Sequence, residues 1–583
     1  MIRLLRPLFP YLRRYRTGLL WGSLTVLISN CASAYSPQIL SMAVNALRAG
    51  TTGKRILIFA AMIIAVSIVK NIFLFLCRWI IIGISRDIEV DLRNDLFLQL
   101  EKQSTHYFNT NRTGDIMARM TNDLKAVREL LGPAILYGAN TLFFSIFAVY
   151  YMLRISPRLT LVALVPMPLA SVLVQYFGRR IHERFEQIQA MYSDISAQTQ
   201  ENLSAVRLVR AYAQEEAQIR FFETANKEYI RRSLLLVQLM GMLWPSLEFV
   251  LGIAMFVTLL YGGHLVIDHQ MNVGNFVAFN AYMLMLTWPI IAVGWVVNLV
   301  QRGTASVGRI QEILSHQPEM TDSDADPDIQ PGHRIKGDIE FVHLNFDYGA
   351  APVLCDINLS IPAGTSLALV GPTGSGKTTL ASLIPRLYDA AEGCVLIDGI
   401  PVRRYPFSVL RSNIGVVPQE TFLFSETLLE NIRFGRPGAS LEEAKTVAEA
   451  AQIRKEIEEF PNGFDTMVGE RGVTLSGGQK QRTSIARALL TEPAILILDD
   501  ALASVDTYTE ERILEALRKQ MQGRTTLLIS HRVSTVRNAD RIAVLDSGRI
   551  IEIGTHSELL EQGGYYAGLA QKQQLEEELT VLG

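Results

Sequence analysis

The chain has 583 residues, of which only 19% are charged, against about 25% in an average soluble protein. Its mean hydropathy is +0.20 and its formal net charge is −2. This composition excludes a disordered chain, a collagen-like chain and a disulfide-rich secreted domain, and it disfavours a nucleic-acid partner, which would require a large positive charge. The four cysteines are too scattered for a metal site and are expected to be ordinary buried residues: Cys31, Cys77, Cys355 and Cys394.

The first 16 residues are basic and contain no acid; the five arginines are Arg3, Arg6, Arg13, Arg14 and Arg16. Because Pro7 and Pro10 interrupt this segment, we expect a short amphipathic stretch that lies on the anionic inner surface of a membrane. A cleavable signal peptide is the alternative, since Ala32-Ser33-Ala34 imitates a cleavage site. The apolar run continues past that site, however, and cleavage would remove one of six apolar segments.

Six apolar stretches follow within the first 305 residues, at about 17–40, 56–85, 130–153, 159–178, 234–267 and 275–303. Each holds the roughly 20 residues that a helix needs to cross the hydrocarbon core. Helices are the only open-chain structures that satisfy their own backbone there. Residues 1–317 are therefore predicted to form an all-α transmembrane domain with six spans.

The distribution of Lys and Arg predicts the orientation of these spans. The long segments after the second and fourth stretches carry most of the basic residues, whereas the other loops are short and carry few. Basic loops remain in the cytoplasm, so both termini are expected to be cytoplasmic in a multi-pass protein of the inner (cytoplasmic) membrane. The two long segments have helical patterns and should extend beyond the bilayer.

Hydropathy and patterning change after the last apolar stretch. Residues 318–337 contain three Pro and five acidic residues and are predicted to be a linker. Residues 338–572 alternate β-branched runs with helical patterns, which is typical of an α/β nucleotide-binding domain. Residues 573–583 are expected to form a solvated helix or tail.

A phosphate-binding loop is the first motif of this second half. The sequence SLALVGPTGSGKTTL at 366–380 places a strand before G-x-x-x-x-G-K-[ST] and a helix start after it. Backbone N–H groups of such a loop converge on phosphate oxygens, Lys377 would reach the β- and γ-phosphates, and Thr378 would ligate Mg²⁺. The predicted cofactors are ATP and Mg²⁺. The predicted nucleotide-binding residues of the loop are Gly371, Thr373, Gly374, Ser375, Gly376, Lys377, Thr378 and Thr379.

Two further motifs belong to the same chemistry. The apolar strand AILILDD at 494–500 ends in two carboxylates, and Asp499 is placed to hold Mg²⁺ through water. Between the loop and this strand, LSGGQKQRTSIARALL at 475–490 opens a helix whose first N–H groups are free for an anion. This segment matches the signature of ATP-binding cassette (ABC) proteins, and the whole chain resembles a half-size ABC exporter. The signature residues, which in that family complete an ATP site of the facing subunit, are Leu475, Ser476, Gly477, Gly478 and Gln479.

The resemblance implies roles for five more residues. Tyr348 would stack on adenine, and Gln419 would be a Mg²⁺ ligand that also senses the membrane domain. Glu470 matches the loop before the signature, and Asp506 matches the aspartate of the D-loop. His531 matches the switch histidine that contacts the γ-phosphate. The resemblance also implies that residues 108–124 and 201–216 are coupling segments that dock on the ATPase.

One position departs from the family pattern. Competent members have a glutamate after the strand-ending aspartate, where this chain has Asp500, whose carboxylate reaches about 1 Å less far, a scale of misplacement that costs about 10²-fold in rate. Ala503 also replaces a serine that is usual in the D-loop, whereas the signature is intact. The catalytic set is thus predicted as Asp500, His531 and Gln419, with a slow site in this chain.

We therefore expect the degenerate-site subunit of a heterodimeric exporter. Its partner would be a second half-transporter that supplies the glutamate. A homodimeric exporter or lipid flippase, and an ATP-gated channel-type membrane protein, are the alternatives.

The substrate is only broadly indicated, as an amphipathic drug or lipid. Polar residues inside apolar stretches are costly in lipid and are either functional or paired across the helix bundle: Lys70, Asn71, Arg78, Glu248 and Asn298. Trp244-Pro245 and Trp288-Pro289 are candidate bends in the last two spans. Met283, Met285 and Trp288 would suit an apolar path, although core packing explains them equally well.

Overall fold

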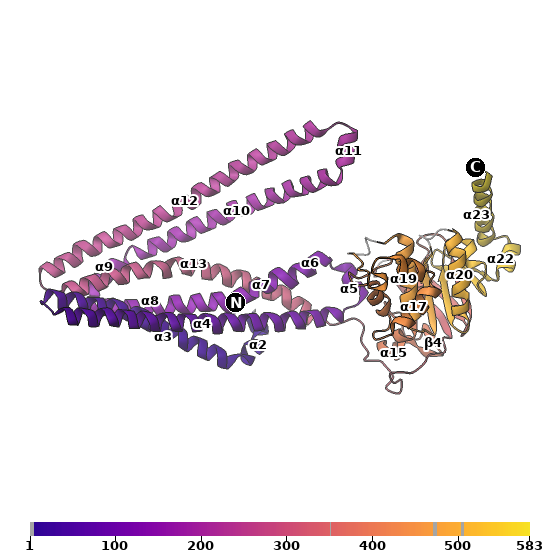
Figure 1. Ribbon diagram of the computed structural model, residues 1–583, viewed down its shortest axis with the longest axis horizontal. Helices are drawn as coiled ribbons and strands as arrows, with labels where there is room; N and C mark the ends of the chain where they lie inside the picture. Colours follow the sequence, from indigo (N-terminus) through magenta and orange to yellow (C-terminus); the bar gives the residue numbers. More distant parts are fainter. Residues whose placement is uncertain (1–4, 350, 470–474, 503–506, 583) are drawn as a thin grey trace. The chain divides into compact units, whose positions relative to one another are not determined.

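The computed structural model describes residues 5–349, 351–469, 475–502 and 507–582, and the chain divides into two compact units. The first, here the helical unit, comprises residues 1–102 and 111–316. The second, the α/β unit, comprises residues 103–110 and 317–583. An N-terminal helical domain is thus followed by a domain with two sheets, in agreement with the predicted fold class (Figure 1).

The helical unit consists of long helices joined by short turns. Its helices are α2 (Phe9–Arg14), α3 (Arg16–Arg48), α4 (Gly53–Glu101), α6 (Thr113–Ala118), α7 (Leu124–Glu129), α8 (Ile135–Ile155), α9 (Pro157–Leu164), α10 (Met167–Ser204), α11 (Val206–Ala211), α12 (Glu215–Ile267) and α13 (Val273–Ser315). Two π-helical turns, Arg119–Asp123 and Leu130–Ala134, join α6, α7 and α8 into one continuous segment. Pro245 and Pro289, predicted as possible bends, lie inside α12 and α13 without ending either helix.

Five helical segments in the described residues are long and apolar enough to cross a membrane, with mean hydropathy from 1.5 to 2.4. They are Gly53–Glu101, Thr113–Ile155, Pro157–Ser204, Glu215–Ile267 and Val273–Ser315. The chain is therefore a multi-pass membrane protein. The first predicted span lies in α3, which is not among the five, and it stays a prediction.

A polar stripe along one face of α3 accounts for its lower hydropathy. The stripe consists of Asn30, Gln38, Ser41 and Asn45 at helical spacing. Helix α3 packs against α8 and α13. Polar groups buried in this way must find partners. The pairs that link α3 to α8 and α13 are Asn30–Asn140 (2.6 Å), Gln38–Tyr282 (3.2 Å), Ser41–Asn275 (2.9 Å) and Asn45–Asn272 (3.2 Å).

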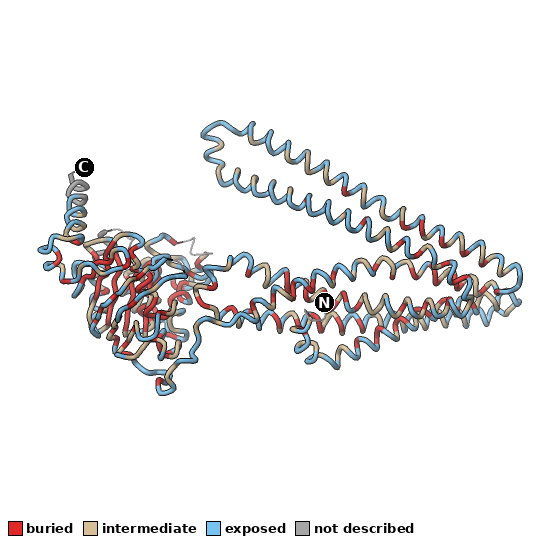
Figure 2. Tube along the Cα trace, turned by 180° about the vertical axis from the view of Figure 1, so that it is seen from behind, coloured by how far each residue is buried: buried red, intermediate tan, exposed pale blue. Residues whose placement is uncertain are grey.

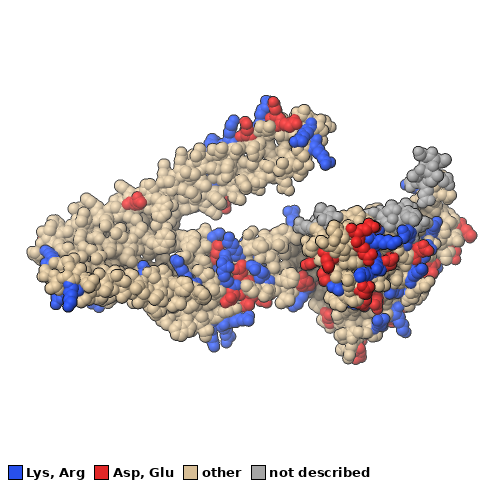
Figure 3. Space-filling model, viewed as in Figure 1, with Lys and Arg blue, Asp and Glu red and all other residues tan. Residues whose placement is uncertain are grey.

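Helices α10 and α12 run side by side and are joined by the short helix α11. Toward α11 both helices are largely exposed, as the pale blue trace in Figure 2 shows. Charged side chains gather near α11 on the face drawn in Figure 3, whereas the opposite ends of these helices are nearly free of charge. This distribution fits helices that extend beyond a hydrocarbon layer into water.

The polar residues proposed for the spans differ in exposure. Arg78, Glu248 and Asn298 are exposed, and Lys70 is half-buried. Asn71 is also exposed, and its side chain donates to the Ser67 carbonyl 2.8 Å away on its own helix. None of these five shows a side-chain bond to another helix among the hydrogen bonds and ion pairs of the described residues.

Of the residues suggested for an apolar path, Met283 is part of the packed core of the helical unit. Trp288 is 61% exposed, and Met285 is half-buried. Core packing therefore accounts for Met283, and Trp288 is the one of the three that remains accessible.

The α/β unit is built on two sheets. One has four strands in the order β2-β1-β4-β5, and the other has six in the order β10-β9-β3-β8-β7-β6. The strands are β1 (Ile339–Asp347), β2 (Pro352–Ile361), β3 (Ser366–Val370), β4 (Val395–Ile397), β5 (Ile400–Pro401), β6 (Ile414–Val417), β7 (Ile495–Asp499), β8 (Thr525–Ile529), β9 (Arg541–Asp546) and β10 (Arg549–Gly554). Strands β7 and β8 are buried along their whole length, which fits the apolar runs Ile495–Leu498 and Leu527–Ile529.

The α/β unit also contains helices, most of which contribute apolar residues to its core. They are α5 (Thr105–Thr110), α14 (Lys377–Leu383), α15 (Phe407–Ser412), α16 (Leu428–Arg433), α17 (Leu441–Ala450), α18 (Arg454–Glu459), α19 (Gly477–Leu490), α20 (Thr507–Met521), α21 (Val533–Val536), α22 (His556–Gln562) and α23 (Tyr565–Leu582). The predicted tail thus begins inside α23, a helix of 18 residues.

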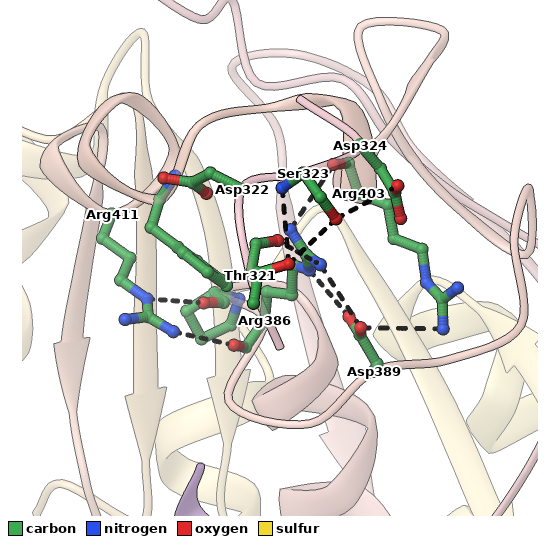
Figure 4. A network of polar contacts seen from close by, with 10 residues as sticks. Thr321, Asp322, Ser323, Asp324, Arg386, Asp389, Arg403 and Arg411 are labelled. Carbon is green, nitrogen blue, oxygen red and sulfur yellow. Dashed lines mark hydrogen bonds and ion pairs between the residues drawn. The ribbon is translucent and has the colours of Figure 1, made fainter. Parts of the chain in front are cut away.

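The predicted linker is closely bound to the α/β unit. Its few apolar residues include Ile329 and Ile335, which are buried in the core. The side chain of Arg386, 2% exposed, lies beneath the linker (Figure 4), where it bonds Asp389 at 2.7 Å and donates to the Thr321 carbonyl at 3.4 Å. A buried guanidinium needs such a carboxylate partner, so the linker is held as part of the domain.

Candidate functional site

The central sheet brings the predicted site residues to one edge. Strands β3, β8, β7 and β6 are neighbours and parallel. Carboxyl ends of neighbouring parallel strands share an edge, where ligands bind in open α/β sheets. The segments that leave this edge carry the phosphate loop after β3, His531 after β8, Asp499 and Asp500 at the end of β7, and Gln419 after β6.

Glycines in the phosphate loop are required by backbone geometry. At Gly371 (φ +151°) a Cβ atom would lie 2.0 Å from the Leu545 carbonyl oxygen. At Gly376 (φ +103°) it would lie 2.7 Å from the Leu354 side chain. Gly376 is the N-cap of α14 and provides no side-chain cap, so the first N–H groups of this helix stay available to an anion.

Lys377 is buried inside the loop, at 6% exposure. Its Nζ donates to the carbonyls of Gly371 at 2.9 Å and Pro372 at 2.8 Å, and it lies 3.4 Å from the Ser375 hydroxyl. Burial lowers the pKa of this lysine, and the nearby carboxylates of Asp499 and Asp500 raise it. The ammonium is thus held within the loop on neutral carbonyls, in position for phosphate oxygens.

Asp499 is the buried carboxylate of this edge, at 6% exposure. Burial raises its pKa, while a hydrogen bond from Thr378 and the charges of Lys377 and His531 lower it. A buried carboxylate beside a hydroxyl is the oxygen ligand set that Mg²⁺ accepts together with phosphate oxygens and water. Asp499 and Thr378 therefore fit the expected metal. Among the described residues, no group of three or more His, Cys, Asp or Glu side chains could hold a metal ion by itself, so phosphate oxygens and water would complete the coordination.

Asp500 lies directly after β7 and is half-buried. Its backbone adopts φ +47°, and its N–H donates to the Ile529 carbonyl of β8 at 2.9 Å. Aspartate tolerates this left-handed region better than most residues. The backbone thus fixes the start of a short side chain next to Asp499, the predicted metal ligand.

Tyr348 follows β1 and is 40% exposed. Its hydroxyl lies 3.0 Å from the Thr379 hydroxyl of α14, and its ring packs edge-to-face on Phe346 and Tyr388, both at 5.0 Å between centroids. The ring is therefore tied to the phosphate-loop helix while part of its surface stays exposed, which adenine stacking requires.

Gln419 and His531 have exposed side chains at the same sheet edge. His531 follows β8, in which Ile529 is the register partner of Asp499 on β7, so the two residues lie at the same edge. The structure thus brings Lys377, Asp499, Asp500 and His531 together.

The signature segment forms a second cluster. Ser476 is the N-cap of α19, and its hydroxyl accepts from the Gln479 N–H at 3.2 Å. The Gln479 side chain in turn accepts from the Ser476 N–H at 2.9 Å. This capping box fixes the helix start and leaves the N–H groups of Gly477 and Gly478 directed out of the helix.

Glu456 of α18 supports this cluster and was not predicted from the sequence. Its carboxylate accepts from Gln479 at 3.0 Å and pairs with Arg482 through bonds of 2.6 and 3.0 Å. Arg482, 8% exposed, also donates to the Gln452 carbonyl at 2.8 Å. Because Glu456 and Arg482 are 26 positions apart, no local sequence pattern indicates this pair.

Three predicted positions lie outside the described residues, namely Glu470, Ala503 and Asp506. The first predicted coupling segment, 108–124, is divided between the two units, since residues 103–110 belong to the α/β unit. There the Asn109 side chain donates to the Tyr388 hydroxyl at 2.9 Å. The second segment, 201–216, includes α11, whose residues are exposed or half-buried.

Comparison with known families gives two matches along the chain. Residues 19–290 match the ABC transporter transmembrane region, and residues 354–503 match the ABC transporter family. The chain is 35% identical over 580 residues to a probable multidrug resistance ABC transporter ATP-binding/permease protein, YheI, of Bacillus subtilis, covering 99% of this chain and 98% of the relative. It is 38% identical over 493 residues to an ATP-dependent lipid A-core flippase of Syntrophus aciditrophicus, covering 84% of this chain and 81% of the relative.

A solved structure extends the comparison to the fold. The structure of a bacterial Atm1-family ABC exporter with ATP bound aligns with a TM-score of 0.77 at 27% identity. The alignment covers 96% of this chain and 98% of that chain. Membrane and ATP-binding parts therefore occur in the same order in both.

Proposed function

Because this chain belongs to the ABC transporter family and has the fold of an ATP-hydrolysing exporter, we propose that it exports amphipathic drugs or lipids as one subunit of a heterodimer. The relatives support the substrate class, since one is named for multidrug resistance and another for flipping lipid A-core. The candidate membrane spans support export across the cytoplasmic membrane. The basic residues of the long helical extensions support an orientation with both termini and the α/β unit in the cytoplasm.

The observation that carries the heterodimer proposal is the contrast between Asp500 and the signature. Asp500 replaces the glutamate that in this family orients the attacking water, and its backbone is fixed at the end of β7. The signature helix keeps its capping box and its Glu456 support. A subunit with a short carboxylate and an intact signature is suited to complete a partner's ATP site while its own site turns over slowly.

ATP bound at the sheet edge of this chain would be held chiefly by its own residues. Lys377 and the first N–H groups of α14 would bind the phosphates, and Tyr348 would stack on the adenine. Asp499 and Thr378 would hold Mg²⁺, which supplies charge neutralisation at the phosphates. Asp500 would position water with a carboxylate that is one methylene too short, and His531 would contact the γ-phosphate.

Transport would follow from the difference in ATP affinity between two states of the dimer. Two nucleotides shared between facing subunits favour closure, and hydrolysis at the partner's site removes that preference. A ligand shifts such an equilibrium only by its differential affinity for the two states. The slow site of this chain would then keep one nucleotide bound while the other site cycles.

Isolation of the tagged chain from its native membranes tests the composition. We expect a 1:1 complex with a second ABC half-transporter that has glutamate after its strand-ending aspartate. A complex that contains only this chain would contradict the proposal and favour the homodimer. Reconstituted vesicles separate a pump from an ATP-gated channel, because only a pump accumulates dye against a gradient.

A further inference from the structure

The C-terminal helix α23 is anchored in the α/β unit from its first turn. The Glu552 carboxylate of β10 accepts hydrogen bonds from the N–H groups of Tyr565 and Tyr566, two donors that the helix itself cannot satisfy. Tyr566 is fully buried in the core, and its hydroxyl lies 2.8 Å from the His556 ring nitrogen. Burial raises the pKa of Tyr566 to about 12, so this hydroxyl remains protonated at physiological pH.

One face of α23 continues from this anchor. Tyr566, Leu569 and Gln573 are spaced i, i+3 and i+7, which places them on one side of a helix. Tyr566 belongs to the core of the α/β unit, and Leu569 packs against it. Gln573 is half-buried on the same face, and α23 contacts α21 there.

Gln573 bonds the backbone of the switch segment at two points. Its Nε2 donates to the His531 carbonyl at 2.7 Å, and its Oε1 accepts from the Val533 N–H at 2.8 Å. Val533 is the first residue of α21, and the N-cap residue Arg532 provides no side-chain cap. Gln573 therefore satisfies a helix-start donor that the local sequence leaves open.

The His531 side chain itself is exposed, so its position depends on the backbone that carries it. The Ser530 hydroxyl, which accepts from the Arg532 N–H at 3.1 Å, is one local restraint on this backbone. The amide of Gln573 adds a donor and an acceptor in one plane, which fixes both the place and the orientation of residues 531–533.

We propose that Gln573 is a positioning residue of the ATP site: it holds the His531 segment so that the imidazole meets the γ-phosphate. The discrimination between ATP and ADP then depends on the C-terminal helix. This inference rests on the proposed contact of His531 with the γ-phosphate, and it does not depend on whether the facing subunit is identical.

The test uses the full chain with Gln573→Leu, which keeps the side-chain size and removes both hydrogen bonds. Gln571→Ala is the matched control, since Gln571 is exposed on the same helix. Two measurements are made: hydrogen exchange of the Val533 amide, and the affinities for fluorescent ATP and ADP analogues. Gln573→Glu is a second variant; its carboxylate still accepts from Val533 and has no hydrogen to donate to the His531 carbonyl.

We expect Gln573→Leu to accelerate exchange of the Val533 amide and to lower the affinity ratio of ATP to ADP about fivefold, with ADP affinity unchanged, because one hydrogen bond is weakened at the γ-phosphate. Gln573→Glu should keep the Val533 amide protected and still lower the ratio. Gln571→Ala should change neither. In a His531→Ala background, Gln573→Leu should have no further effect on the ratio.

Unchanged exchange at Val533 in Gln573→Leu would overturn the inference. So would an equal loss of ATP and ADP affinity, which indicates a merely structural role. If His531→Ala alone leaves the ratio unchanged, the proposed γ-phosphate contact itself is wrong, and the inference falls with it.

Discussion

Two helices of the α/β unit, α14 and α19, begin at glycine-containing segments that are expected to meet phosphate, and they treat their first N–H groups differently. The N-cap of α14 is Gly376 in a left-handed conformation with no side-chain cap. The N-cap of α19 is Ser476 in a complete capping box. The start of α14 thus has no side-chain cap, whereas at α19 the capping box satisfies the N–H groups of Ser476 and Gln479 and leaves those of Gly477 and Gly478 for a ligand.

The side-chain contacts around the two helix starts also differ. Lys377 at the start of α14 donates hydrogen bonds to two carbonyls of the loop. Burial lowers the pKa of Lys377 and raises the pKa of Asp499, which favours the neutral form of each. At α19, Glu456 and Arg482 form a paired network that holds Gln479. Burial of a lysine and a carboxylate therefore destabilises the phosphate loop when no nucleotide is bound, whereas side-chain contacts already hold the signature helix start in place.

Lys377→Ala should have the largest effect on the phosphate side. The ammonium is proposed to bond two phosphate groups, so its loss should weaken ATP binding to this chain about 10²–10⁴-fold, since each charged hydrogen bond contributes about 1.5–3 kcal/mol. Equilibrium binding of a fluorescent ATP analogue measures the loss, with the exposed Lys519→Ala as control. Retained affinity would show that the loop backbone alone binds the phosphates.

Asp500→Glu should raise the ATPase rate of the purified single chain by about 10–100-fold, because the longer side chain restores the reach to the attacking water. In a dimer of this chain both signatures are intact, so the short carboxylate is expected to limit the rate, and this substitution lengthens it. Steady-state phosphate release measures the rate, and Asp500→Asn, which lacks a base, should stay at the low level. An unchanged rate in Asp500→Glu would show that reach does not limit this site.

Glu456→Gln should weaken the signature side without affecting ATP binding by this chain. The amide retains one acceptor for Gln479 but loses the charge that pairs Arg482, so turnover of the complete transporter should fall about 5–10-fold. Glu459→Gln, an exposed neighbour on α18, is the control. Equal losses of turnover and of ATP affinity would indicate that the α/β unit is destabilised as a whole.

Asp499→Asn should stabilise the protein when no nucleotide is bound. Folding raises the pKa of Asp499 above its unfolded value of 3.8. The contribution of this carboxyl to the free energy of unfolding is therefore fully present below pH 3.8, and it is lost as the pH rises through the pKa of the folded protein. At pH 7.5 the buried charge thus destabilises the nucleotide-free protein, and the amide should raise its Tm by about 2 °C. The difference should shrink as the pH is lowered.

Addition of Mg²⁺ and ATP gives the complementary measurement. Wild-type protein should gain stability on ligand binding, whereas Asp499→Asn should gain much less because a metal ligand is missing. A variant that is less stable without nucleotide, or one that gains as much from Mg²⁺ and ATP, would contradict the metal assignment.

The sequence predicted those parts of the site that are local in the chain. The loop from Gly371 to Thr378 and the strand that ends at Asp499 each combine an element with its chemistry in a few residues, and parallel strand order then brings them to one edge. Pairs formed by tertiary packing were not predictable in this way. Gln573 and His531 are 42 positions apart, and each residue type alone is common in helices and loops.

The membrane half shows the same division. Apolar stretches indicated the spans, because transfer of apolar residues into lipid depends on composition alone. The polar face of α3 is stabilised by hydrogen bonds to α8 and α13. A hydropathy profile contains no information on such tertiary hydrogen bonds. The linker is a similar case, since its charge pattern suggested a free segment whereas Ile329 and Ile335 are buried and Arg386 bonds its backbone.

The contrast between the short carboxylate of Asp500 and the intact signature is tested most directly by ATP turnover. The rate of the purified single chain is measured in lipid nanodiscs with Mg²⁺ and ATP and compared with that of the complex isolated from native membranes. The account predicts slow hydrolysis by the chain alone and a rate that is higher by about two orders of magnitude in the complex, where a partner contributes the longer carboxylate. Equal, rapid hydrolysis by this chain on its own would contradict it.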